Sequence, residues 1–125
     1  MRDDVVSAIQ LRQLAEHGGE PGLRDAGLLA SALARPRNRL AYGDARADLA
    51  DLAAAYAFGL VKNHPFVDGN KRTAAVVCET LLEINGHELT AGDKELFQTF
   101  FRLAEGTLSE KKLAGWIRSR VRPRG

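Results

Sequence analysis

Residues 64–82 read HPFVDGNKRTAAVVCETLL, a polar turn that contains glycine and leads into a run that is apolar almost all round. A helix that is apolar on every side belongs in the interior of a protein. We therefore predict a central, buried helix that begins near Gly69 and runs to Asn85-Gly86. Proline disfavours the helical conformation of the residue before it, so the preceding helix should stop before Pro65.

The rest of the chain is also helical in pattern, because apolar residues recur about every 3.6 positions and alternation is nearly absent. Gly18-Gly19 should end a first helix, and a short second helix should end before Pro36. Residues 36–46 are expected to form a loop or short hairpin, and the C-terminal phenylalanines and Trp116 are expected in the core. The fold class is therefore all-α, a single domain of six helices marked by residues 5–14, 25–34, 49–61, 69–86, 96–101 and 113–121.

Length and composition limit the class of protein. The 125 residues suffice for one domain, and 45% hydrophobic with 27% charged residues is an ordinary globular balance. No apolar run approaches the roughly 20 residues that span a bilayer, and no signal-peptide stretch follows the first residues. One cysteine, Cys78, cannot form an internal disulfide, which fits a reducing compartment. We therefore expect a cytoplasmic protein without a membrane partner.

The arginines form two groups, the second of which includes a basic tail at residues 122–125. The net charge of +2 is too small to indicate nucleic acid by itself. An ordinary solvated face explains such groups, and an acidic protein partner or a phosphorylated ligand is the alternative. The residues concerned are Arg35, Arg37, Arg39, Arg118, Arg120, Arg122 and Arg124.

The start of the predicted buried helix carries charges of the wrong sign. Asp68 is placed to cap the first turn, but Lys71 and Arg72 fall in that same turn, where the helix dipole is positive. Each cation is unfavourable there by roughly 0.3–1 kcal/mol at an exposed site. A bound anion removes this conflict, so the free N–H groups of the helix start, Lys71 and Arg72 would form a phosphate cradle.

Neighbouring residues supply further parts of such a site. Gly69 allows backbone and ligand to approach closely, and Asp68 offers the oxygen ligands that Mg²⁺ prefers. His64 carries an imidazole, which is suited to take a proton from an attacking hydroxyl. Each residue alone has an ordinary explanation as a loop histidine, a helix cap or a solvated cation. Their combination beside a buried helix favours a functional site.

Residues 64–72 closely resemble the signature of the Fic/Doc family, which is His-x-Phe-x-Asp-Gly-Asn followed by a variable residue and arginine. The resemblance covers residues 5–121 and implies one Fic/Doc domain, with the signature loop at the N-terminus of the central helix. Six other segments look typical of Doc toxins: Glu16-His17-Gly18-Gly19, Gly22-Leu23-Arg24-Asp25, Leu33-Ala34-Arg35-Pro36, Ala41-Tyr42-Gly43, Asn63-His64 and Glu83-Ile84-Asn85-Gly86.

Two positions distinguish the branches of this family. Adenylyl-transferring Fic proteins have Gly-Asn-Gly-Arg-x-x-Arg, whereas this chain has Lys71 for the glycine and Ala75 for the second arginine. Both substitutions match the Doc branch, which implies a protein kinase. The lysine fills space where a triphosphate would lie, and the missing arginine removes a phosphate clamp. The nucleotide would then present its γ-phosphate to the target hydroxyl.

The resemblance also implies a role for each signature residue. His64 would act as the general base, and Asp68 would hold Mg²⁺. Lys71 and Arg72 would serve catalysis as well as binding. The residues that would bind the phosphates of ATP are Gly69, Asn70, Lys71 and Arg72.

Three further expectations concern the surroundings of the signature. Phe66 should anchor the loop in the core, and residues 35–42 correspond to the flap that docks the target protein in this family. Gln10 stands where Doc-like chains commonly have a histidine in the first helix, so the role of that position is open.

For biology, the resemblance implies the toxin of a type II toxin–antitoxin system. Its target would be elongation factor Tu, phosphorylated on a threonine so that translation stops. Its partner would be a small, Phd-like antitoxin whose disordered segment folds over a groove on the toxin.

Three alternatives stay open at this point. The chain could transfer an adenylyl group to a protein hydroxyl, or it could be a non-catalytic binding module on the same fold. A nucleic-acid-binding repressor is less favoured, because no helix-turn-helix pattern stands out. Direct binding to nucleic acid is therefore not expected.

Overall fold

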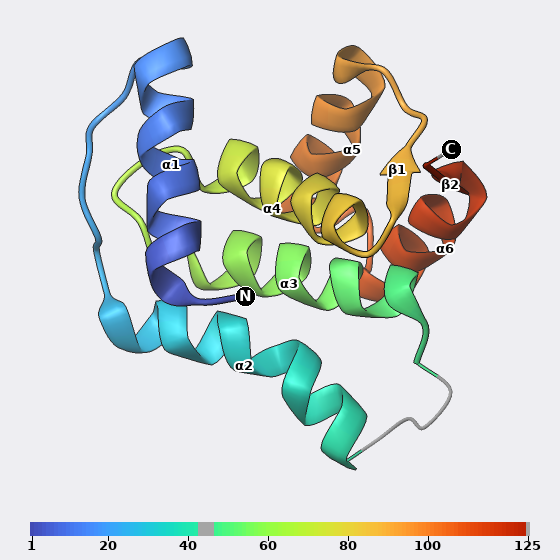
Figure 1. Ribbon diagram of the computed structural model, residues 1–125. Coiled ribbons are helices and arrows are strands. Elements are labelled where there is room, and N and C mark those ends of the chain that lie inside the picture. Colours follow the sequence, from blue (N-terminus) through green and yellow to red (C-terminus); the bar gives the residue numbers. More distant parts are fainter. Residues whose placement is uncertain (43–46, 125) are drawn as a thin grey trace.

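The computed structural model describes residues 1–42 and 47–124, with the backbone alone for residues 39–42. Its described residues form six helices and two short strands, which confirms the all-α fold class (Figure 1). None of these helices is both long and apolar enough to cross a membrane. The helices are α1 Asp3–His17, α2 Ala26–Tyr42, α3 Leu49–Asn63, α4 Asn70–Ile84, α5 Asp93–Glu105 and α6 Glu110–Arg120, and the strands are β1 His87–Leu89 and β2 Val121–Pro123.

Helices α3 and α4 lie side by side in the middle of the molecule (Figure 1). Helix α2 covers α3 on one side, and α6 also packs on α3. Helices α1 and α5 both pack against α4 and rise on either side of it. The start of α4 is therefore placed between α1 and α5, where side chains of three helices can meet.

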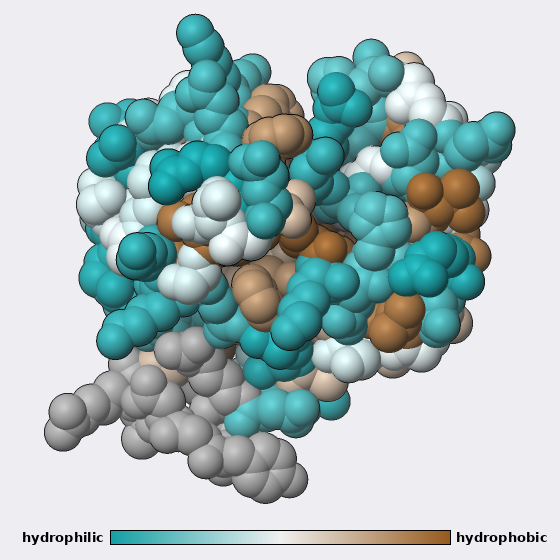
Figure 2. Space-filling model, turned by 180° about the vertical axis from the view of Figure 1, so that it is seen from behind, coloured by the Kyte–Doolittle hydropathy of each residue, from teal (hydrophilic) through white to brown (hydrophobic). Residues whose placement is uncertain are grey.

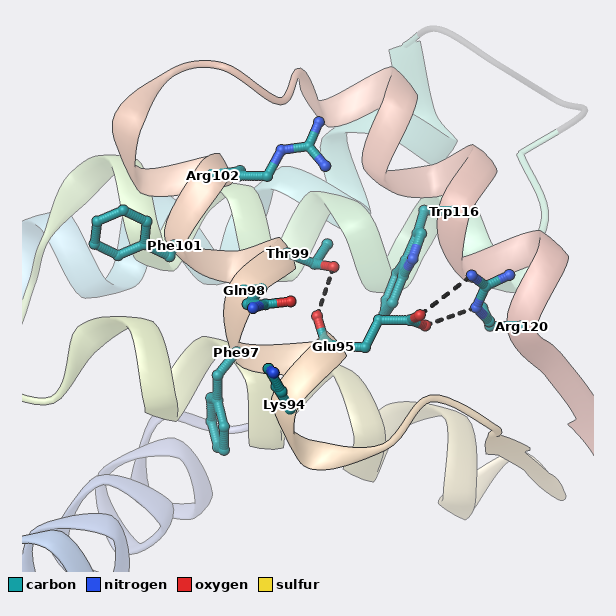
Figure 3. Close-up of a pocket in the computed structure, with 9 residues that line it drawn as sticks. All are labelled: Lys94, Glu95, Phe97, Gln98, Thr99, Phe101, Arg102, Trp116 and Arg120. Atoms are coloured by element: carbon teal, nitrogen blue, oxygen red, sulfur yellow. Dashed lines mark hydrogen bonds and ion pairs between the residues drawn. The ribbon is translucent and has the colours of Figure 1, made fainter.

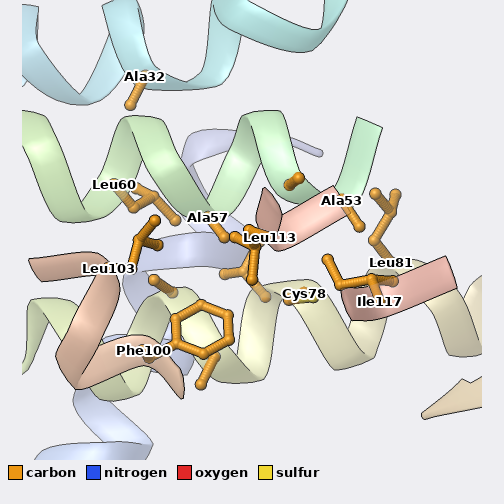
Figure 4. Close-up of a cluster of buried hydrophobic side chains, with 14 of the residues drawn as sticks. Ala32, Ala53, Ala57, Leu60, Cys78, Leu81, Phe100, Leu103, Leu113 and Ile117 are labelled. Atoms are coloured by element: carbon orange, nitrogen blue, oxygen red, sulfur yellow. The ribbon is translucent and has the colours of Figure 1, made fainter. Parts of the chain in front are cut away.

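The central position of α4 follows from its sequence. Its apolar residues from Ala74 to Leu82 include five that are fully buried, as predicted for a helix without a polar face. Alanines on the facing side of α3, including Ala53 and Ala57, leave room for the two helices to approach closely. Between them gather larger side chains from the last two helices (Figure 4), namely Phe100, Leu103, Leu113 and Ile117. Burial of each such side chain contributes about 1.5–3 kcal/mol to folding.

The structure of α2 differs from the loop that was predicted at residues 36–46. The helix continues through Pro36 to Tyr42, so the prediction of a loop from residue 36 is wrong as far as residue 42, and residues 43–46 lie outside the described residues. Proline inside a helix costs about 3 kcal/mol, but here Pro36 is itself buried, and packing on α3 outweighs that cost. At Gly59 of α3 a Cβ would lie 3.1 Å from the backbone of Ala32, so the two helices are in close contact. Residues 35–42, expected to be a target-docking flap, are thus the end of α2.

The C-terminal end differs from expectation in two ways. Val121 begins β2 instead of ending the last helix, and Arg122 and Pro123 of the expected basic tail pair antiparallel with β1. Phe101 is 52% exposed, so its predicted place in the core is wrong, whereas Phe100 is fully buried. Neighbouring residues of a helix point about 100° apart, and only one of the two can face the core.

Candidate active site

The signature loop begins where α3 ends. His64 is the C-cap of α3 and lies in the left-handed region, with φ 52° and ψ 54°, and it is the one non-glycine residue with positive φ among the described residues. That conformation costs a non-glycine residue about 1–2 kcal/mol, and such strain is concentrated at functional sites. The next two residues turn inward: Pro65 is buried and Phe66 is 2% exposed, which confirms the predicted anchor. The anchor leaves the His64 side chain exposed at the surface.

Asn70 fixes the loop from inside. Its amide accepts a hydrogen bond from the Phe66 N–H and donates one to the Phe66 carbonyl, both at 3.0 Å, and the residue is 4% exposed. The side chain therefore has a structural task that the sequence did not show. Phosphate binding by Asn70 stays a prediction, and its backbone N–H at the helix start is the group placed for it.

Asp68 is not the helix cap. Gly69 occupies that position with φ 75°, and α4 has no side-chain cap, because Asp68 lies one residue too early. The Asp68 carboxylate instead accepts hydrogen bonds from the N–H groups of Gly69 at 2.8 Å and Glu20 at 3.2 Å. These bonds, together with the nearby charges of Arg72 and His64, lower the pKa of Asp68 below its ordinary value. The carboxylate is therefore held in place and stays ionised.

The surroundings of Asp68 determine what kind of magnesium site it could form. It is exposed and ionised, but among the described residues no group of three or more His, Cys, Asp or Glu side chains could hold a metal ion. Magnesium at nucleotide sites is commonly held by one or two carboxylates, with phosphate and water oxygens completing its shell. The donor set therefore suits Mg²⁺ that arrives with a nucleotide.

The segment after α1 runs along the signature loop and supports it. The Pro65 carbonyl accepts hydrogen bonds from the N–H groups of Arg24 at 2.7 Å and Asp25 at 3.0 Å, and the Val67 N–H donates to Gly22 at 3.0 Å. At Gly19, where φ is 127°, a Cβ would lie 2.7 Å from the Asp68 carboxylate. Only glycine allows this approach, which explains part of the Gly18-Gly19 pair that the sequence offered merely as a helix stop.

Two side chains that hold the loop were missed from the sequence. Gln10 of α1 is 2% exposed and donates from Nε2 to the Asp68 carbonyl at 3.2 Å, which gives the open position in the first helix a task. Arg24 donates from Nε to the His64 carbonyl at 2.7 Å and from Nη2 to the Asn63 carbonyl at 2.9 Å. A polar residue on the inner face of α1 was a signal for Gln10. Arg24 stood only within a segment typical of Doc toxins, and its partners lie about 40 residues away.

The signature residues share one pocket, with a volume of about 720 Å³. Helix α1 contributes His17, which the sequence analysis missed as a site residue, and α5 contributes Phe97, Phe101 and Ala104. The Lys71 ammonium lies 5.3 Å from the centre of the Phe101 ring. Seen from behind, the surface is mainly hydrophilic, with hydrophobic side chains in a furrow between two lobes (Figure 2). All the predicted site residues line this pocket: His64, Asp68, Gly69, Asn70, Lys71 and Arg72.

A second hollow of about 820 Å³ lies on α5 and α6 (Figure 3). It shares Phe97 and Phe101 with the first pocket. Its one carboxylate, Glu95, is paired with Arg120 at 2.7 Å, and no histidine or cysteine lines it. The second hollow has cations of its own, Lys94, Arg102 and Arg120, but of the two hollows only the His64 pocket combines cations with a histidine suited to proton transfer.

Fold and pocket together define a class of protein: an all-α domain that presents a histidine, a carboxylate and two cations at the start of a buried helix. Residues 2–82 match the model of a family described as the Fic/DOC family. The chain belongs to the Fic/Doc family.

Two relatives are of the expected Doc type, which confirms the predicted resemblance. The chain is 46% identical over 90 residues to "Toxin Doc" of Mycolicibacterium smegmatis, a match that covers 72% of this chain and 66% of that protein. It is 30% identical over 111 residues to "Protein kinase doc" of Escherichia phage P1, which covers 89% of this chain and 86% of that protein. The chain thus spans just under two thirds of the first relative's length.

Proposed function

We propose that this protein is a Doc-type toxin that transfers the γ-phosphate of ATP to a serine or threonine hydroxyl of another protein. The observation that carries the proposal is the placement of His64, Asp68, Lys71 and Arg72 around one pocket at the uncapped start of α4. The names of the two relatives, a toxin and a protein kinase, support it.

Phosphate binding follows from the charges at the start of α4. The first turn has no acidic residue, and its N–H groups meet no capping side chain. Lys71 and Arg72 are both exposed there and line the pocket. Phosphate oxygens would accept hydrogen bonds from these donors and remove the repulsion between the two cations and the helix dipole. The cations also stabilise the charge that develops on the transferred group.

His64 would act as the general base. Its imidazole takes the proton of the target hydroxyl while that oxygen forms a bond to the γ-phosphorus. The bond from the γ-phosphorus to the bridging oxygen breaks, and ADP leaves with the electron pair. Bound Mg²⁺ would supply charge neutralisation at the phosphate oxygens, with Asp68 as its protein ligand.

The kinase reaction is favoured over adenylyl transfer by two residues of α4. Lys71 stands in the first turn and extends over Phe101, so its charge occupies the place where the adenylyl-transferring branch has glycine. Ala75 is fully buried in the core and offers no phosphate contact in place of that branch's second arginine. The site therefore lacks the second arginine clamp of the adenylyl-transferring branch and has a lysine where that branch has glycine.

In the cell, the target would be a translation factor, with elongation factor Tu as the first candidate, and the effect would be inhibition of translation. A Phd-like antitoxin would be the cognate partner. The antitoxin partner is inferred from the name of the mycobacterial relative, a toxin. The translation factor is inferred from the family resemblance of the signature alone.

The deciding experiment compares ATP labelled at the γ or the α phosphate, with elongation factor Tu and then a whole lysate as acceptor. We expect label from γ only, lost in His64→Ala and kept in His87→Ala, a histidine on β1 outside the pocket. Label from the α phosphate would replace the kinase with an adenylyl transferase. No label from either, in any acceptor, would leave a non-catalytic binding module.

A further inference from the structure

The arginine after the first helix holds the end of α3 in an unusual way. Arg24 donates to two consecutive carbonyls, those of Asn63 and His64, at 2.9 and 2.7 Å. The last carbonyls of a helix have no partner within it and attract cations. Asn63 is fixed further by its own side chain, which donates to the Leu28 carbonyl at 2.9 Å.

The backbone of Arg24 is itself anchored to the loop that follows His64. Its N–H donates to the Pro65 carbonyl at 2.7 Å, in a short bridge between Leu23 and Phe66. Three successive carbonyls, from Asn63 to Pro65, are thus bonded to one residue 40 positions away. These bonds span the one left-handed non-glycine residue of the described chain.

Arg24 is outside the pocket that His64 lines, so it is not placed to touch a bound nucleotide. We infer that Arg24 is a positioning residue: its guanidinium holds His64 in the left-handed conformation that points the imidazole at the reacting hydroxyl. This inference rests on the proposed function and adds a residue to it that lies outside the signature. A planar fork that reaches two carbonyls at once is a property of arginine that lysine lacks.

The test compares steady-state phosphate transfer by wild type, Arg24→Ala and Arg24→Lys. We expect Arg24→Ala to lower kcat on the order of 10²-fold, as misplacement of a catalytic group does, with the KM for ATP unchanged. Arg24→Lys should fall between wild type and Arg24→Ala, and free guanidinium should restore part of the rate of Arg24→Ala.

Arg12→Ala is the matched control, since Arg12 is an exposed arginine of α1 that pairs with Glu16 at 3.2 Å. It should keep the wild-type rate. A raised KM for ATP with kcat intact would overturn the inference. Thermal unfolding identifies any variant that has lost its fold. If Arg24→Ala does not fold, the transfer rate of Arg24→Lys is compared with that of wild type instead.

A second readout separates this inference from the proposed function. The NMR signals of the His64 ring should shift in Arg24→Ala and stay unchanged in Arg12→Ala. If wild type transfers no phosphate, the proposed function fails, yet the ring signals still decide whether Arg24 positions His64. Unchanged ring signals in Arg24→Ala would contradict the inference in either case.

Discussion

The N-terminal ends of α3 and α4 differ in capping and in charge. Helix α3 begins with a capping box, in which the Asp48 carboxylate accepts from the Asp51 N–H at 2.9 Å and Asp51 accepts from the Asp48 N–H at 3.0 Å. Helix α4 begins with Gly69, no capping side chain and no acid in its first turn, but with Lys71 and Arg72. The first start satisfies its own N–H groups by capping, whereas the second has no capping side chain and is where we propose that phosphate binds.

This difference separates stability from activity along one chain. Changes at the start of α3 should alter the free energy of unfolding and leave phosphate transfer intact. Changes at the start of α4 should lower phosphate transfer without lowering the free energy of unfolding. The following four predictions test that separation, from the largest effect to the smallest.

Arg72→Ala should lower kcat/KM for phosphate transfer by about 10²–10³-fold, because one donor to the transferred phosphate is lost. Arg72 is exposed at the positive end of the α4 dipole, so its loss should not lower the thermal unfolding temperature. Labelled transfer assays and calorimetry measure the two quantities. Full activity in this variant would remove Arg72 from the phosphate cradle.

Asp48→Ala should lower the free energy of unfolding by about 0.5–2 kcal/mol, the usual cost of a lost N-cap. Asp48 also pairs with Arg118 at 2.7 Å on the surface, and loss of this pair adds up to about 1 kcal/mol. Urea unfolding measures the loss, and the transfer rate should equal that of wild type. A reduced rate in the folded variant would show that the two helix starts are not independent.

Lys71→Glu should raise the free energy of unfolding by about 0.3–1 kcal/mol, because an acid replaces a cation at the positive end of the α4 dipole. The same change should abolish phosphate transfer. A variant that is both more stable and inactive would support the view that Lys71 is kept for a ligand. A variant less stable than wild type would refute the electrostatic account of this helix start.

The pH dependence of the free energy of unfolding should reveal the contribution of Asp48 at the start of α3. Hydrogen bonds from Arg118, with those of Asp51, hold the pKa of Asp48 well below its ordinary value of 3.8. A depressed pKa contributes stability that is present above pH 3.8 and is lost as the pH falls toward the folded-state pKa. Asp48→Asn should therefore flatten the acid limb of the stability curve relative to wild type. An identical acid limb in both proteins would contradict the pairing.

Local pattern was enough to predict much of this molecule. The apolar run of α4 predicted the buried helix, and Pro65 predicted the end of α3. The positive charges of Lys71 and Arg72 predicted a phosphate cradle, and both residues line the pocket. In each case the cause lies within a few residues of the effect. Helix periodicity and helix-end electrostatics are short-range rules, so they can be read along the chain.

The misses have long-range causes. Helix α2 continues through Pro36 because it packs on α3, and the two-stranded sheet forms because β2 returns to β1 after α5 and α6. The contacts of Gln10 and Arg24 join residues 58 and 40 positions apart. Asp68 precedes the N-cap position by one residue, and its carboxylate accepts a hydrogen bond from the Glu20 N–H across the loop. Tertiary contacts decided each of these, and one sequence does not specify them.

The measurement that tests the central claim most directly is calorimetric binding of Mg²⁺-ATP to wild type, Lys71→Glu and Asp48→Ala. If the start of α4 is the phosphate site, wild type and Asp48→Ala should bind with equal Kd, and Lys71→Glu should bind at least about tenfold more weakly, a loss of 1.4 kcal/mol or more. Equal Kd values for all three proteins would contradict the account, because the nucleotide would then bind away from the helix start that lacks a cap.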